Sequence, residues 1–262
     1  MKILVTNDDG IFAQGLWTLA RELKNIAEVV VSAPERGDFA MGTAVSAGRQ
    51  GLRPKRVQPV VPEIETYCVK GTPADSVIFA LHKLVKEKID LIIAGINYGS
   101  NMEYDVFASG TVGAALIGWH SGLPALSISV DYGDNPPLDT AAKLAVALAK
   151  RIESGALPSN IFLNINLPNL PLAKIKGIKT TYVAKGVYTD TFEEKRDGRR
   201  VYYQGERYRG NRATDEGTDV WAVQQGYISI LPLHRFICPM FNEPSPYIPD
   251  TLWSDLFHEL QQ

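Results

Sequence analysis

The sequence predicts an α/β protein built on a mostly parallel sheet. Short apolar runs of the kind that form buried strands alternate along the chain with segments that have helical periodicity. The order strand, helix, strand implies right-handed parallel units. The first apolar run, residues 3–5, stops abruptly at Asn7-Asp8-Asp9-Gly10. Because ligands bind beyond the carboxyl ends of parallel strands, this turn is where a site is expected.

The elements follow one another in a regular order. After the strand at residues 3–5, leucines and alanines at helical spacing predict a helix over residues 14–26, and residues 28–33 are a second buried strand. The loop over residues 34–46 leaves the carboxyl end of that strand, so it faces the same edge as Asp8. Further strands are predicted at residues 66–69, 90–94, 125–130, 161–165 and 227–232, with a weaker edge candidate at 57–61, and helices at 72–85, 111–119 and 138–152.

The character of the chain changes from about residue 177. Residues 178–183 start a strand, residues 184–216 are very polar, and Asp197-Gly198 is a tight hairpin signal. We therefore expect a projecting β-hairpin arm over about 184–216, within a single domain that spans residues 1–262. The tail, about 236–262, ends in a short amphipathic helix whose apolar face must dock on its own body or on a neighbouring subunit. Long projecting arms usually have a partner, so the arm favours an oligomer.

Composition limits the partners. The chain has 262 residues and a net charge of −2, which provides no general attraction to nucleic acid or to an anionic membrane. No apolar run approaches the length that spans a bilayer, and the first ten residues do not have the pattern of a secretory signal. Two cysteines, Cys68 and Cys238, suggest a reducing compartment. We expect a cytoplasmic enzyme or binding protein with no nucleic-acid or membrane partner.

The adjacent carboxylates of Asp8 and Asp9 are the strongest functional signal. Two charges beside a low-dielectric core favour either a raised pKa or a bound cation. Hard divalent cations such as Mg²⁺ take the carboxylate and amide oxygens that Asn7, Asp8 and Asp9 offer. The alternative is that the pair only caps the following helix.

Two further stretches converge on the same edge. The loop Gly95-Ile-Asn97-Tyr-Gly-Ser-Asn101 follows a parallel strand, and Asn97 offers a neutral oxygen ligand while Asn101 can hold a phosphate or sugar oxygen. Ser109-Gly110-Thr111 at a helix start supplies hydroxyls, free backbone N–H groups and the positive end of a helix dipole, which together suit an anion. Acid pair, amide loop and helix start indicate a metal with a phosphate pocket, in which a metal can polarise the phosphoryl group.

Other chemistries are less well represented. The sequence has no GxSxG elbow, no GxxxxGK[ST] loop, no Cys/His metal cluster and no dinucleotide fingerprint after the first strand. Its four histidines are scattered at positions 82, 120, 234 and 258. Because His234 follows the carboxyl end of a strand, it is the histidine that we place near the site.

Eight stretches resemble the SurE (survival protein E) family along nearly the whole chain. They are ILVTNDDGI at 3–11, APER at 33–36, KGTPADSV at 70–77, DLIIAGINYGSN at 90–101, DVFASGTVGAA at 105–115, LNINLP at 163–168, GTDVWAV at 217–223 and GYISILPL at 226–233. The resemblance implies a three-layer α/β/α Rossmann-like fold, with a projecting hairpin and a C-terminal segment exchanged between subunits of a homodimer or homotetramer. It also implies metal-dependent removal of phosphate from nucleoside 5′-monophosphates, with 3′-monophosphates and short polyphosphate as further substrates.

The resemblance also implies residue roles. Asp8, Asp9 and Asn97 match metal ligands for one divalent ion, Mg or Mn, in each subunit. Asn101 and Ser109-Gly110-Thr111 match the phosphate pocket, to which we add Asn7. Either Asp8 or Asp9 activates the attacking water, and direct attack by a carboxylate is a further alternative.

Three departures from the family pattern bear on turnover. Phe39 stands where the family usually has a serine metal ligand, and Asp38 is a candidate substitute. The residues from Phe236 to Met240 replace a common Asp-x-Thr-x-His run. Glu103 replaces a usual glycine, and we expect it to add a carboxylate beside the pocket. These changes keep open a second hypothesis, a metal- and nucleotide-binding homologue with reduced or lost catalysis. A phospho-acceptor receiver domain also has paired acids after its first strand but is about half this length.

Overall fold

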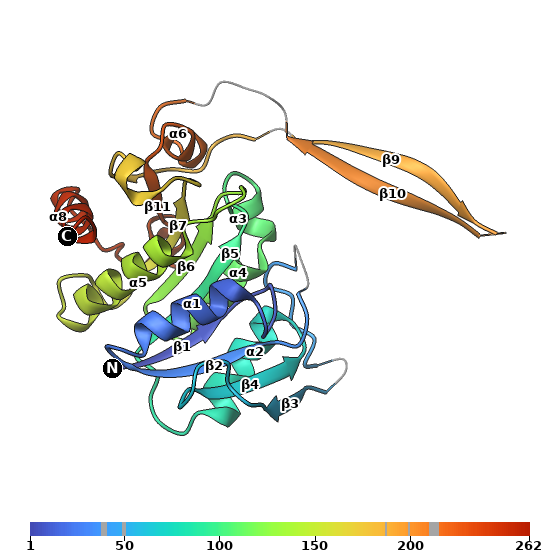
Figure 1. The fold of residues 1–262 in the computed structure, drawn as a ribbon, viewed down its shortest axis with the longest axis horizontal. Coiled ribbons are helices and arrows are strands. Elements are labelled where there is room, and N and C mark those ends of the chain that lie inside the picture. Colours follow the sequence, from blue (N-terminus) through green and yellow to red (C-terminus); the bar gives the residue numbers. More distant parts are fainter. Residues whose placement is uncertain (38–40, 49–50, 187, 199, 210–214) are drawn as a thin grey trace.

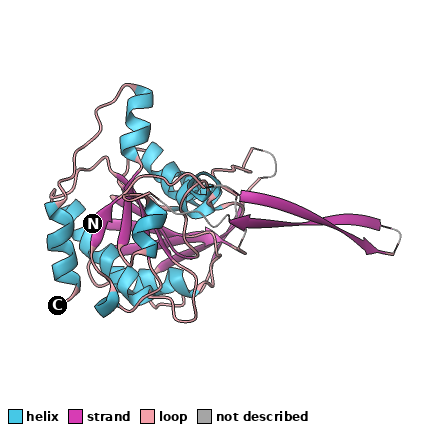
Figure 2. Ribbon diagram, turned by 90° about the horizontal axis from the view of Figure 1, so that it is seen from above, coloured by secondary structure: helices cyan, strands magenta, loops and turns pink. Residues whose placement is uncertain are grey.

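The computed structural model describes residues 1–37, 41–48, 51–186, 188–198, 200–209 and 215–262. These residues form a nine-stranded sheet with the strand order β3-β4-β2-β1-β5-β6-β7-β11-β8, and a separate two-stranded hairpin (Figure 1). Helices cover both faces of the sheet (Figure 2). The predicted three-layer α/β/α fold is confirmed.

Six strands of the sheet run parallel. They are β1 (Lys2–Thr6), β2 (Glu28–Pro34), β4 (Glu65–Lys70), β5 (Leu91–Tyr98), β6 (Ala125–Val130) and β7 (Phe162–Leu167). β1 lies between β2 and β5, with Ile3 aligned with Val29 on one side and with Leu91 on the other. β3 (Arg53–Arg56) pairs antiparallel with β4 at one edge, and β11 (Ile228–Pro232) pairs antiparallel with β7 near the other, followed by β8 (Ile178–Thr180).

Alternation along the strands divides the core into two layers. Ile3 and Val5 pack with α1 (Gln14–Leu23) and α5 (Leu138–Glu153), whereas Leu4 packs with α2 (Pro73–Phe79) and α4 (Gly110–His120). Strands buried on both faces read as continuous apolar runs, which is why the sequence identified them. The remaining helical elements are η1 (Ala80–Leu84), α3 (Asp105–Ala108), η2 (Leu172–Lys174), α6 (Asp219–Gln224), α7 (His234–Ile237), η3 (Cys238–Phe241) and α8 (Thr251–Leu260).

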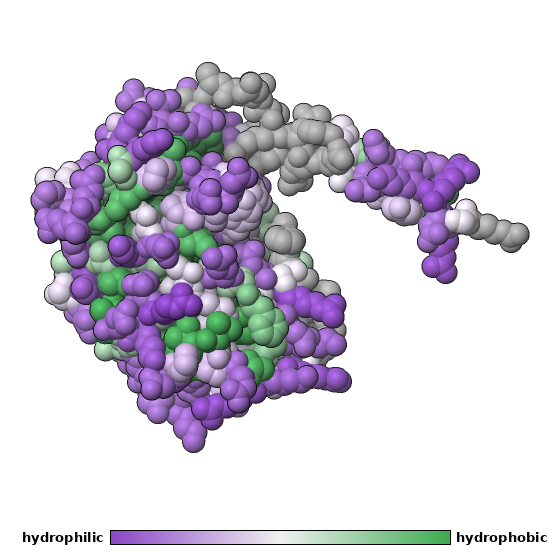
Figure 3. Space-filling model, in the orientation of Figure 1, coloured by the Kyte–Doolittle hydropathy of each residue, from purple (hydrophilic) through white to green (hydrophobic). Residues whose placement is uncertain are grey.

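A long hairpin projects from the body, as the sequence predicts. β9 (Tyr188–Asp197) and β10 (Arg200–Arg209) pair antiparallel along their whole length (Figures 1 and 2). The described part of this arm is mostly hydrophilic on the face seen in Figure 3, while apolar residues form patches on the body. A two-stranded hairpin standing alone in water is only marginally stable.

The tail helix α8 packs on its own chain. Trp253, Leu256 and Leu260 are buried in the same core layer as α5. An ion pair joins Arg151 of α5 to Glu259 at 2.8 Å. Exchange of this segment between subunits stays a prediction, since the structure contains one chain.

Several details differ from the predicted elements. The edge strand is Arg53–Arg56 rather than residues 57–61, and the helix predicted over 72–85 ends as α2 at Phe79 and continues as the π-helical turn η1. β5 runs to Tyr98, four residues beyond the predicted strand, with a register shift between Ala94 and Asn97. No helix within the described ranges is both long enough and apolar enough to cross a membrane.

Candidate functional site

The acid pair lies at the carboxyl end of β1, at the centre of the sheet. Asp8 is almost fully buried and Asp9 is partly exposed. The loop after β2 packs directly against this turn, since Ile11 N donates to Pro34 O at 2.8 Å. A Cβ atom on Gly37 would lie 3.0 Å from the carbonyl oxygen of Asp9. The expectation that this loop meets the acid pair is therefore met by its described residues.

The start of α4 holds Asp8. Ser109 is the N-cap residue, and its hydroxyl accepts a hydrogen bond from Val112 N at 3.1 Å. The hydroxyl of Thr111 donates a short hydrogen bond to Asp8 Oδ1. Gly110 permits this approach, because a Cβ atom there would lie 2.9 Å from Asp8 Cβ. The three residues Ser109-Gly110-Thr111 therefore bring the N-terminus of an eleven-residue helix against a carboxylate.

Burial raises the pKa values of both carboxyl groups, Asp8 and Asp9. Burial raises the pKa of Asp8, while the Thr111 hydroxyl and the N–H groups at the start of α4 act to lower it, and the net change is upward. Burial and the charge of Asp8 raise the pKa of Asp9 to about 6. Two adjacent carboxyl groups with raised pKa values are typical of a site that binds a cation or transfers protons.

The amide loop after β5 is fixed by buried polar residues. Asn97 Nδ2 donates to Gly99 O at 2.7 Å, so its oxygen is the side-chain atom able to bind a cation. Asn101 N donates to Asn166 Oδ1 at 2.8 Å, and Asn101 O accepts from the Nδ2 atoms of Asn164 and Asn166 at 2.8 and 3.1 Å. These bonds tie an irregular loop to β7.

A pocket of about 190 Å³ opens between these elements. It is lined by Asp8, Asn97, Tyr98, Gly99, Ser100, Asn101, Asp105, Ala108, Ser109 and Tyr132. Asn7, which we expected at the substrate, is fully buried, and its Nδ2 donates to Gly10 O at 2.9 Å. Of the predicted site residues, Asp8, Asn97, Asn101 and Ser109 line this pocket. Gly110 and Thr111 contact Asp8 behind the lining, Asp9 follows Asp8 in the same turn, and Asn7 lies buried beneath that turn.

Some residues that line or support the pocket were not singled out in the sequence. Asn164 and Asn166 stand two apart in an otherwise apolar strand. Because buried polar groups are hydrogen-bonded, this pattern indicates two buried amides that bond other parts of the chain. Asp105 and Tyr132 line the pocket but lie in a short helix and a loop. Their local sequence carries no signal that separates them from ordinary surface residues.

A sequence profile described as "Survival protein SurE" matches residues 3–190. The chain belongs to the SurE family. It is 45% identical over 253 residues to a protein of Dehalococcoides mccartyi named 5′-nucleotidase SurE, covering 96% of this chain and 94% of that protein. A Haemophilus influenzae protein of the same name is 38% identical over 235 residues, covering 89% and 91% of the two chains. The crystal structure of the SurE protein from Aquifex aeolicus superposes with a TM-score of 0.74 at 30% identity, covering 92% of this chain and 100% of that one.

The donor set of this SurE chain fits a hard divalent cation. Asp8, Asp9 and Asn97 supply oxygen atoms, the preferred ligands of Mg²⁺ and Mn²⁺. The buried Oδ1 atom of Asn7, in the same turn, has no hydrogen-bond partner. Within the described ranges no group of three or more His, Cys, Asp or Glu side chains is placed to hold a metal ion elsewhere. Phe39, which was expected at the serine-ligand position, and Asp38, the candidate substitute one residue earlier, lie outside the described residues.

His234 and Glu103 lie away from the positions expected for them. His234 does not lie near the site: because β11 runs antiparallel to β7, its carboxyl end lies at the opposite edge of the sheet. There the Nδ1 atom of His234 lies 3.1 Å from both Phe162 N and Phe162 O. Burial lowers the pKa of this imidazole. The prediction that His234 lies near the acid pair was therefore wrong. The apolar pattern of a strand does not show whether the strand runs parallel or antiparallel to its neighbours.

Glu103 also lies elsewhere than expected. It adopts a left-handed conformation with φ 55°, its backbone N donates to Asp219 Oδ2 at 3.0 Å, and its side chain is buried. A Cβ atom on Gly186 would lie 2.8 Å from Glu103 Cδ, so this carboxyl packs at the base of the arm.

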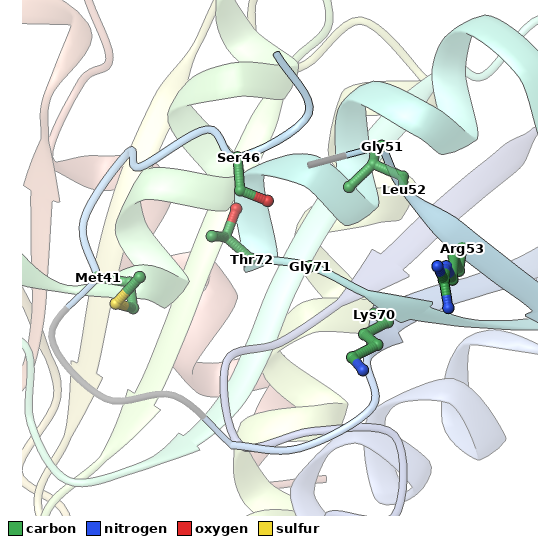
Figure 4. Close-up of a pocket in the computed structure, with 8 residues that line it drawn as sticks. All are labelled: Met41, Ser46, Gly51, Leu52, Arg53, Lys70, Gly71 and Thr72. Atoms are coloured by element: carbon green, nitrogen blue, oxygen red, sulfur yellow. The ribbon is translucent and has the colours of Figure 1, made fainter. Parts of the chain in front are cut away.

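A second hollow lies on the β3–β4 side of the acid pair. It measures about 740 Å³, and Arg53, Lys70, Ser46 and Thr72 are among its lining residues (Figure 4). Arg53 and Lys70 stand opposite each other across β3 and β4. Thr72 caps α2 through a bond from Asp75 N, so its oxygen already has a donor. Charged side chains on an edge strand also prevent pairing with other sheets, which is a sufficient reason for these cations.

Proposed function

We propose that this chain is a divalent-metal-dependent phosphatase that hydrolyses nucleoside 5′-monophosphates. The SurE relatives in Dehalococcoides mccartyi and Haemophilus influenzae are named 5′-nucleotidases and match almost the whole chain. The observation that carries the proposal is the placement of Asp8, one of two adjacent carboxylates, against the N-terminus of α4 and in one pocket with Asn97. This combination provides a cation site and an anion site within one small pocket.

In this proposal Asp8, Asp9 and Asn97 hold one Mg²⁺ or Mn²⁺ ion per subunit. When bound, the ion would polarise the phosphoryl group and lower the pKa of a water molecule. The start of α4 at Gly110 and Thr111 stabilises negative charge on the phosphate through the positive end of the helix dipole, while the N–H groups of these two residues also hold the Asp8 carboxylate in place. Ser109 and Asn101 complete the phosphate pocket with a hydroxyl and an amide.

The two carboxylates have different roles. Asp8 is buried and fixed by the Thr111 hydroxyl, so it acts chiefly as a positioned ligand. Asp9 is more exposed, and a pKa of about 6 leaves it mostly ionised at pH 7. It is therefore the better candidate to accept the proton of the attacking water.

The proposal extends to secondary substrates, the oligomeric state and the cellular compartment. We include 3′-monophosphates and short polyphosphate as secondary substrates, and a homodimer or homotetramer assembled through the arm. The tail would exchange between subunits of that assembly. Cys68 and Cys238 are both free thiols, which supports a cytoplasmic enzyme.

The test is phosphate release from adenosine 5′-monophosphate by metal-free protein to which Mg²⁺ or Mn²⁺ is added back. We expect release only with metal, and a loss of at least 100-fold in Asp8→Ala, while the exposed Asp139→Asn control keeps wild-type turnover. Adenosine 3′-monophosphate and tripolyphosphate under the same conditions define the secondary activities. Undiminished release by Asp8→Ala would refute the assignment. Thermal stabilisation by metal and nucleotide without phosphate release would instead support the binding homologue that the altered Phe236–Met240 stretch suggests.

A further inference from the structure

Two tyrosine rings form one wall of the pocket. Tyr98 is the last residue of β5, and Tyr132 lies in the loop after β6. Their ring centroids are 5.1 Å apart and the ring planes are at 89°. The side chain of Tyr132 is 69% exposed and that of Tyr98 is 44% exposed. What sets these two rings apart from other exposed aromatic side chains in the described ranges is that they contact each other and both line the acidic pocket.

The loop that carries Tyr132 is fastened on both sides of the ring. The hydroxyl of Tyr98 donates to Gly133 O at 2.8 Å and accepts from Gly133 N at 3.3 Å. The hydroxyl of Ser100 donates to Asp131 Oδ1 at 2.8 Å. The residues directly before and after Tyr132 are thus tied to β5 and its following loop. Because the ring is already held in place, binding a ligand on it costs little additional conformational entropy.

The ring rests on the backbone beside a predicted metal ligand. A Cβ atom on Gly99 would lie 2.6 Å from both Cζ and the hydroxyl of Tyr132, so only glycine allows the phenol to settle there. Gly99 O accepts the amide hydrogen bond of Asn97. Burial and the negative charge of Asp9 raise the pKa of the Tyr132 phenol, which therefore stays neutral around pH 7. The platform is uncharged and directly adjoins the reacting centre.

Among the described residues, the opposite flank of the acid pair has no comparable surface. The residues lining the hollow beside β3 and β4 include no aromatic ring (Figure 4). Phe107 of α3 is 73% exposed, but it lines an apolar groove with Val112 and Leu116 rather than the acidic pocket. Among the described residues that line the acidic pocket, only the two tyrosines offer a π-face to a planar ring.

We propose that Tyr132 is the surface on which the base of a nucleoside monophosphate stacks, with Tyr98 as its positioning residue. The inference rests on the proposed nucleotidase function and adds the feature that distinguishes a nucleotide from other phosphate esters. Every base has a π-face, so stacking accepts purines and pyrimidines alike. The platform therefore selects for the presence of a base rather than for one base.

The test compares adenosine 5′-monophosphate with ribose 5-phosphate, which keeps the sugar and phosphate but has no base. Wild-type protein should prefer the nucleotide. Tyr132→Ala should lower kcat/KM for the nucleotide about 10-fold, mainly through KM, and leave that for ribose 5-phosphate unchanged. Tyr132→Phe should keep the preference, and Tyr98→Phe, which loses both bonds to Gly133, should weaken it. Phe107→Ala is the matched control and should change neither substrate.

Titration calorimetry with the same two ligands provides a measurement that does not depend on turnover. The wild-type difference in affinity between nucleotide and ribose 5-phosphate should disappear in Tyr132→Ala. Equal binding of both ligands by wild-type protein would overturn the proposal, as would an equal loss for both substrates in Tyr132→Ala, which indicates a merely structural role. Hydrolysis of neither substrate by wild-type protein, with the affinity difference retained, would refute the nucleotidase assignment and leave the platform standing.

Discussion

Replacing Asp9 by asparagine should stabilise the metal-free protein at neutral pH. The carboxyl of Asp9 has a pKa of about 6 in the folded chain, because burial and the charge of Asp8 disfavour its ionised form, against an ordinary value of 3.8. The folded state therefore binds this proton more tightly than the unfolded chain does. By linkage, the free energy of unfolding falls as the pH rises from about 4 to about 6 and stays low above that range.

The size of the effect follows from the two pKa values. The rise from 3.8 to about 6, at about 1.4 kcal/mol for each pKa unit, corresponds to about 3 kcal/mol as an upper limit. Asp9 is partly exposed, so solvent screening reduces this figure, and we expect about 1–2 kcal/mol. Asp9→Asn removes the ionisation and should recover that amount at pH 7.5 but nothing near pH 4.

Urea unfolding in the presence of a chelator, at pH 4.5, 6.0 and 7.5, measures the difference between wild type and Asp9→Asn. The exposed Asp134→Asn should show no such pH-dependent gain. Adding Mn²⁺ at pH 7.5 should stabilise wild type and leave the variant almost unchanged, because the cation site has lost a ligand. A variant less stable than wild type at pH 7.5 without metal would refute the view that charge repulsion dominates this turn.

Three further substitutions test the packing around the site. Gly110→Ala should cut phosphate release at least 10-fold and lower the free energy of unfolding by about 1–3 kcal/mol in urea, because the new Cβ would lie 2.9 Å from Asp8 Cβ; wild-type kinetics would contradict this. Asn166→Ala leaves Asn101 N without its buried acceptor, so urea unfolding should show a loss of about 1–3 kcal/mol together with slower turnover. Trp253→Ala should cost about 3–5 kcal/mol by the same measurement while specific activity at 25 °C stays unchanged, and reduced turnover would tie α8 to the site.

The central strands could be predicted because strands buried on both faces consist almost entirely of apolar residues. β1 and β5 are buried on both faces, so residues 3–5 and 91–94 appear as unbroken apolar runs. The ends of those strands then place Asp8 and Asn97 at one edge by topology alone. This is why most of the acidic pocket was predictable before any coordinate was known.

Elements at the periphery of the sheet could not be predicted in the same way. β3 has the sequence RPKR, whose charges suit an edge strand but give no apolar alternation. The direction of β11 depends on its pairing with β7, which its own residues do not encode, and so His234 was placed at the wrong edge. Tyr132 comes to the pocket through tertiary hydrogen bonds from Tyr98 and Ser100 to its neighbours, contacts that no local pattern reveals.

The amides of β7 have a consequence for the timescale on which the site moves. Asn101 N lies in an irregular loop, yet it donates to the buried oxygen of Asn166. In native-state hydrogen exchange this N–H should be protected as strongly as those of the neighbouring strands, because releasing it requires the sheet itself to open. The loop beside the acid pair would then exchange its amide hydrogens as slowly as the core does. Nucleotides would enter and leave the pocket while this wall of it stays folded.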